Sequence, residues 1–154
     1  MSAPHLIFSA AFVTSAALAG CMGHDMSPGQ DQVATGAAEA RSALSDAKKA
    51  VSAWRGADGP AGLEALRAAT RRMGAGMERA MEGGGQMMSH GHHCKGFGTM
   101  VSAMGMAHDG MQMMSGAVAT LGSPLDEEAT VSRLLEGMKM TERGLDAIAS
   151  SNCL

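Results

Sequence analysis

The segment from residue 28 to residue 55 puts the tightest constraint on the fold. Its apolar residues recur at alternating steps of four and three, as Val33, Ala37, Ala40, Leu44, Ala47, Val51 and Trp54. This spacing places them along one face of an α-helix. The helix has a clear start, because Ser27 and Gln30 match a capping box and Pro28 suits the first helical position. We therefore predict a helix over 28–55 whose apolar face is covered by other helices.

Three further segments carry the same kind of pattern. The second follows a turn at 56–59, starts at Pro60 and has an apolar face made of Leu63, Leu66, Thr70, Met73, Met77 and Ala80, with Met81 beside it. Three consecutive glycines at 83–85 predict its end, and a loop over 86–92 follows. The third segment begins near His93 and closes at 121–122, with a face made of Phe97, Val101, Met104, His108, Met111, Ser115 and Val118. The fourth follows a capping signal at 123–126 and extends to about 151, with Val131, Leu134, Leu135, Met138, Leu145 and Ile148.

Four amphipathic helices joined by short turns predict an all-α fold, an antiparallel up-and-down four-helix bundle over residues 28–154. No run of residues is typical of a strand. The predicted bundle contains one tryptophan and one phenylalanine, so its core has to be built from Leu, Val, Ala and Met. Lys and Arg are scattered and the formal charge is −3, which does not favour nucleic acid as a partner.

The residues before the bundle resemble a bacterial lipoprotein export signal. An apolar run over 6–19 is too short to cross a bilayer, and the sequence Leu18-Ala19-Gly20-Cys21 matches the lipobox of that class. The resemblance implies a cleaved signal peptide over 1–20, lipid on Cys21 and a lipidated tether over 21–27. Because Met22 rather than aspartate follows the cysteine, it also implies a periplasm-facing protein of the cell envelope, anchored in the outer membrane.

Residues 73–114 have an unusual composition for a helical core. They hold eleven of the sixteen methionines and four of the six histidines. Methionine fills irregular gaps in ordinary cores, but Met, His and Cys are also the ligands that suit Cu(I). Leucine would specify the packing of a plain core better, and the segment 28–55 has no methionine at all.

Two helical faces within this stretch combine these ligands. Met73, Met77 and Met81 share one face, and Met100, Met104, His108 and Met111 share another, with a thioether four residues before and three residues after the imidazole. Taken singly, such methionines are ordinary core residues. As a group around His108 they are candidate ligands for Cu(I) or Ag(I).

Several glycines interrupt the two segments that hold the methionines. Gly74, Gly76, Gly105, Gly110 and Gly116 fall inside predicted helices, where each costs about 1 kcal/mol relative to alanine. Either these glycines allow a close approach between helices, or another stabiliser compensates for them. A bound metal ion would be one such stabiliser.

A second group of possible ligands lies between the second and third segments. His90, His92 and His93 fall within four residues, next to Cys94. Histidine-rich tracts are typical of metal binding, although a solvated polar loop is the simpler interpretation. In an up-and-down bundle this tract lies at the same end as Cys153. The two cysteines are expected to form a disulfide in an oxidising compartment, and a pair of thiolate ligands is the alternative.

In composition, residues 73–114 resemble the Met- and His-rich periplasmic proteins that bind copper and silver. The resemblance implies a lipid-anchored protein that sequesters Cu(I) or Ag(I), or transfers it from a donor or to an acceptor protein. One alternative is a b-type haem protein that uses His108 with Met73 or Met77, and another is a structural or chaperone-like envelope lipoprotein without metal. No nucleophile, zinc-protease or phosphate-loop motif is present, so we do not expect an enzyme.

Overall fold

The structure, a computed structural model, describes residues 27–56, 58–91, 94–122 and 127–154. The predicted signal peptide, the lipobox with Cys21, and the tether up to residue 26 lie outside these ranges. So do His92, His93 and the predicted capping signal at 123–126.

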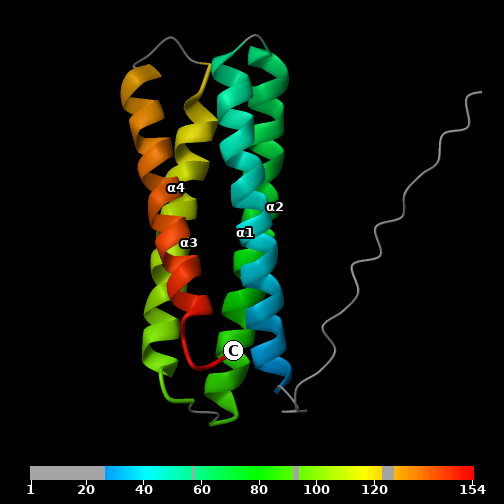
Figure 1. The fold of residues 1–154 in the computed structure, drawn as a ribbon, viewed down its shortest axis with the longest axis vertical. Helices are drawn as coiled ribbons and strands as arrows, with labels where there is room; N and C mark the ends of the chain where they lie inside the picture. The colour runs from blue at the N-terminus through cyan, green and yellow to red at the C-terminus, as the bar shows by residue number, and fades with distance from the viewer. Residues whose placement is uncertain (1–26, 57, 92–93, 123–126) are drawn as a thin grey trace, which may run out of the picture.

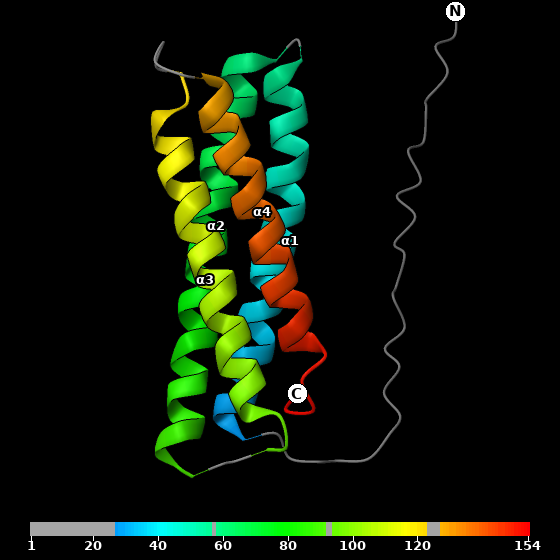
Figure 2. The same cartoon turned by 90° about the vertical axis from the view of Figure 1, so that its left-hand side faces the viewer.

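Four helices run alternately up and down (Figure 1, Figure 2). They are α1 (Pro28–Arg55), α2 (Gly59–Ser89), α3 (Phe97–Thr120) and α4 (Glu127–Ala149). The prediction of an all-α antiparallel four-helix bundle is confirmed, and the residues that the structure describes contain no strand. Among the described helices, none is both long enough and apolar enough to cross a membrane.

The start of α1 follows the prediction closely. The Gln30 backbone N–H donates to the Ser27 hydroxyl oxygen at 3.4 Å, and the Ser27 backbone N–H donates to Gln30 Oε1 at 2.9 Å. These two hydrogen bonds form the predicted capping box. The Gln30 amide nitrogen also donates to the carbonyl oxygen of Cys153 at 3.0 Å, which joins the start of α1 to the end of the chain.

The predicted end of the second helix is wrong. The glycines at 83–85 do not stop α2, which continues to Ser89, so the predicted loop over 86–92 begins too early. Gly83 and Gly84 are buried, because their missing side chains leave room for neighbouring helices. The glycine with the left-handed backbone typical of a helix end is Gly91, with φ +67°. Helix α3 starts at Phe97 rather than near His93, after Gly96 with φ +113°.

Most of the predicted apolar faces are buried. The stripe of α1 from Val33 to Val51 lies in the core, and Trp54 is half-buried. In α3 the predicted stripe is only one side of the buried face, since Ser115 is exposed while a second row faces α4. This second row comprises Met100, Ala103, Ala107, Gly110 and Met114.

Glycines set how the helices pair, α1 with α2 and α3 with α4. A Cβ atom on Gly76 would lie 2.8 Å from the backbone nitrogen of Ala40, and one on Gly83 would lie 2.5 Å from the carbonyl oxygen of Gly29. In the pair of α3 and α4, a Cβ atom on Gly110 would lie 2.5 Å from the backbone nitrogen of Thr141. Of the two explanations for the glycines, close helix approach therefore applies to Gly76 and Gly110. Gly105 and Gly116 have open space around them.

The α1–α2 pair packs against the α3–α4 pair along two seams, one between α1 and α4 and one between α2 and α3. Between α1 and α4, Arg41 pairs with Asp146 at 2.8 Å and Lys48 pairs with Glu142 at 2.6 Å, both half-exposed. Surface pairs of this kind contribute little to stability, about 0–1 kcal/mol each. The seam between α2 and α3 is lined instead by methionines and His108.

Candidate metal centre

Two glycines of α2 make room for two methionines of α3. A Cβ atom on Gly84 would lie 2.6 Å from the methyl carbon of Met104, and one on Gly74 would lie 3.4 Å from the sulfur of Met111. The thioethers of Met104 and Met111 therefore lie directly against α2. Met104 is 5% exposed and Met111 is 7% exposed. The glycines thus position both sulfur-bearing side chains on the seam.

These two contacts fix the register of the antiparallel helices. The stretch of α2 between Gly74 and Gly84 lies opposite the stretch of α3 between Met111 and Met104. Residues 74, 77, 81 and 84 are spaced by three, four and three, so Met77 and Met81 lie on the same face of α2 as the two glycines. The register therefore brings Met77 and Met81 level with His108.

His108 lies between the two seated methionines on α3, and its ring is only partly covered. The residue as a whole is of intermediate exposure. Its Nδ1 atom, however, is buried and has no hydrogen-bond partner, one of two such side-chain atoms in the described part of the chain. A buried polar atom without a partner costs about 1–3 kcal/mol. The imidazole thus keeps one buried, unsatisfied nitrogen on the helix face that also carries Met104 and Met111.

The other ring nitrogen of His108 has a neighbour on the same helix. His108 Nε2 lies 3.4 Å from the side-chain amide of Gln112, one turn further along α3. A half-turn of that amide about its terminal bond places the carbonyl oxygen there, and His108 Nε2–H can then donate to it. In that tautomer Nδ1 carries the free lone pair. Gln112 would therefore act as the partner that orients a metal-binding histidine.

We call the group formed by Met77, Met81, Met104, His108 and Met111 the seam site. It combines one imidazole nitrogen with up to four neutral thioethers. Thioethers need no deprotonation and do not form disulfides, so the set stays available for binding in an oxidising compartment. Soft sulfur ligands select Cu(I) over hard divalent ions. Met81 is 45% exposed, so the seam site is reachable from solvent.

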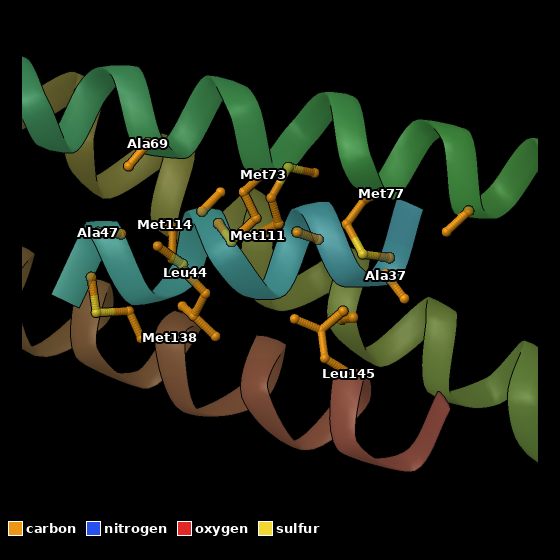
Figure 3. Packing of buried hydrophobic residues seen from close by; sticks show 14 of the residues in the cluster. Ala37, Leu44, Ala47, Ala69, Met73, Met77, Met111, Met114, Met138 and Leu145 are labelled. Carbon is orange, nitrogen blue, oxygen red and sulfur yellow. The ribbon is translucent and has the colours of Figure 1, made fainter. Parts of the chain in front are cut away.

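Met73, also a predicted ligand, lies deeper. It is 0% exposed and one turn of α2 before Met77 (Figure 3). Figure 3 shows Met73, Met77, Met111 and Met114 projecting from α2 and α3 into the same part of the core. Met73 therefore lies behind the seam site, where it packs the core.

His90, the described member of the predicted histidine tract, does not join the seam site. His90 is the C-cap of α2 and is exposed, and its Nδ1 atom lies 2.8 Å from the carbonyl oxygen of Gln86. Nine residues separate His90 from Met81, which is about 13 Å along a helix. Among the described residues, no three His, Cys, Asp or Glu side chains come together in a group that could hold a metal ion.

Cys94 and Cys153 are joined by a disulfide at the same end of the bundle, with their Cα atoms 5.4 Å apart. In the disulfide neither sulfur is a thiolate that could hold a metal ion. This end also carries Met87, which is 1% exposed, and Met88, which is 54% exposed.

Two residues at the seam site were not among the predicted ligands. Met81 was placed on one face with Met73 and Met77 but was not singled out as a ligand, and Gln112, which lies beside the site, was not considered. The signal for Met81 is its spacing of four from Met77 and of three from Gly84. The signal for Gln112 is its spacing of four from His108.

Comparison with known protein families, with curated proteins and with solved structures finds no match to this chain.

Proposed function

We propose that this protein binds a soft monovalent metal ion, Cu(I) or Ag(I), at the seam site. His108 Nδ1 supplies the nitrogen ligand, and Met104 and Met111 supply sulfur from the same helix. Met81 and Met77 supply further sulfur from α2. The function is reversible binding, for sequestration or for transfer to and from a partner protein, and it involves no covalent chemistry.

One observation carries the proposal. The Nδ1 atom of His108 is buried without a hydrogen-bond partner, on a helix whose Met104 and Met111 side chains, one turn to either side, lie against glycines of the opposite helix. A histidine that only filled space would leave this nitrogen unsatisfied at a cost, whereas a coordinated ion would satisfy it. The donor set of one imidazole and several thioethers is neutral, which suits a monovalent cation.

The location of the protein is also a proposal. If Cys21 carries lipid, as the lipobox at 18–21 implies, the bundle is anchored in the cell envelope and faces the periplasm. Thioether sites suit this compartment, where cysteine ligands would be oxidised. The membrane is then one partner, and a metal donor or acceptor protein is the other.

Haem remains the weaker candidate. Ligation by His108 with Met73 or Met77 would require a flat slot between α2 and α3. Met73, Met77 and Met111 already fill that part of the core, with exposed fractions of 0%, 0% and 7%. Haem binding would require these side chains to move, and a Soret band after haem addition would reveal it.

The first equivalent of Ag(I) is expected to raise the thermal midpoint of unfolding. A ligand that binds only the folded state stabilises it by about 2.7 kcal/mol when its free concentration is a hundred times Kd. Changing Met104, His108 and Met111 together to leucine should remove the part of this rise that the seam site supplies, so the triple variant should show a clearly smaller rise. Circular dichroism at 222 nm with and without the ion measures it.

The matched control is Met138→Leu, which changes a core methionine of α4 that is 3% exposed and lies outside the seam site. This variant should keep the full rise in midpoint. An equal rise in the triple variant and in the unchanged protein would exclude the seam site. No rise in any protein would favour the structural or chaperone-like interpretation.

A further inference from the structure

Helices α3 and α4 form a groove on their outer side, away from the core. Glycines bring the two helices close together, since a Cβ atom on Gly144 would lie 2.5 Å from the backbone nitrogen of Ala107, and one on Gly137 would lie 3.0 Å from that of Met114. Core side chains such as Met111, Met138 and Leu145 occupy the inner side of this contact line. On the outer side the structure leaves three methionines that packing does not explain.

These methionines are Met106 and Met113 of α3 and Met140 of α4. Met106 is 43% exposed, and Met113 and Met140 are half-buried. None of them belongs to the buried core. An exposed methionine gains little from packing, because most of its apolar surface stays in contact with water. A packing role therefore does not account for Met106.

Met113 lines a pocket between α3 and α4, and helical spacing relates the other two methionines to it. Met113 lines a shallow pocket between α3 and α4 together with Arg133. Met140 follows Arg133 by seven residues, and Met106 precedes Met113 by seven residues, so each continues the same face of its own helix. The groove that begins at Met113 and Arg133 therefore continues to Met106 and Met140.

The glycine contacts also set the positions of the three residues along the axis of the bundle. Gly144 lies opposite Ala107 and Gly137 lies opposite Met114, so Met140 is level with the part of α3 between Met106 and Met113. In this register Met140 is level with residue 111, about 3 Å along the helix axis from Met113 and about 8 Å from Met106. Methionine side chains are long and flexible enough to close these separations between two close helices. The three thioethers can therefore converge on one ion.

We propose that Met106, Met113 and Met140 form a second site for Cu(I) or Ag(I), on the outer groove between α3 and α4. Its ligands are three neutral thioethers, which suit a soft monovalent cation. It shares no residue with the seam site and does not rest on the function proposed for that site. Because Met106 is exposed, this second site is open to solvent and to a partner protein.

The test is a titration of the full chain with silver nitrate, followed by NMR of protein labelled with ¹³C in the methionine methyl groups. The methyl signals of Met106, Met113 and Met140 should shift together, in one binding step. In Met140→Leu, the shifts of Met106 and Met113 in that step should disappear, since the ion loses its ligand from α4. Circular dichroism checks that the variant keeps its fold.

Met138→Leu is the matched control, because it removes a methionine two residues away that faces the core; it should leave the shifts of Met106 and Met113 unchanged. The Met104, His108 and Met111 triple variant should also leave them unchanged, which separates this site from the seam site. The proposal is overturned if the three signals do not respond to Ag(I). It is equally overturned if Met106 and Met113 still shift in Met140→Leu.

Discussion

Changing Cys94 and Cys153 together to alanine is expected to lower the free energy of unfolding by about 4 kcal/mol. The disulfide joins residues 59 apart in sequence, and closing a loop of that length in the unfolded chain accounts for this amount in the chain-entropy estimate. It also ties the segment before α3 to the end of the chain, where Gln30 of α1 donates to the Cys153 carbonyl oxygen. Denaturant unfolding followed by circular dichroism measures the difference.

Reduction provides the control for this prediction. A reductant should destabilise the unchanged protein to the level of the double variant and should leave the double variant unaffected. The seam site lies further along α2 and α3, so Ag(I) should still stabilise the folded double variant. If the double variant lost less than about 1 kcal/mol of its free energy of unfolding, the disulfide would not constrain the unfolded chain as proposed.

Gly36→Ala is expected to lower the free energy of unfolding by about 3 kcal/mol, although alanine is the better helix former. A Cβ atom at this position would meet the carbonyl oxygen of Gly76 and would lie 2.5 Å from the backbone nitrogen of Ala80. Both are backbone atoms, so neither can rotate away and the two helices have to separate. Overpacking in a closely packed interface typically costs 1–3 kcal/mol, and the loss of a backbone-to-backbone contact puts this case at the upper end.

Gly116→Ala is the matched control. Gly116 lies inside α3 with nothing within 4 Å of an added Cβ atom. There the same change should raise stability by about 1 kcal/mol through helix propensity alone. If both glycine variants gained stability, the close approach of α1 and α2 would be wrong.

The helices were predictable because their apolar residues recur with the helical period. The stripe from Val33 to Val51 and the Ser27 capping box are local patterns that need no knowledge of the neighbouring helices. The end of α2 was not predictable in this way. Glycines at 83 and 84 look like a helix end in the sequence alone, and only the neighbouring Gly29 and Met104 show that they allow close packing.

The candidate site was predictable in part, for the same reason. Met104, His108 and Met111 lie on one helix, so their spacing alone places them together. The contribution of α2 depends on the register between two helices, which the contacts of Gly74 and Gly84 reveal and the sequence does not. The outer row of Met106, Met113 and Met140 depends on the register of α3 and α4 and was not predicted as a site.

The most direct test of the seam site is the state of the His108 ring during a titration with Ag(I). NMR of ¹⁵N-labelled histidine reports each ring nitrogen separately. We predict that one equivalent of Ag(I) shifts Nδ1 of His108 while Nε2 keeps its proton, and that the methyl signals of Met104 and Met111 shift in the same step. If both nitrogens of His108 keep their metal-free shifts while the protein binds Ag(I), the ion is held elsewhere and the account of the seam site is wrong.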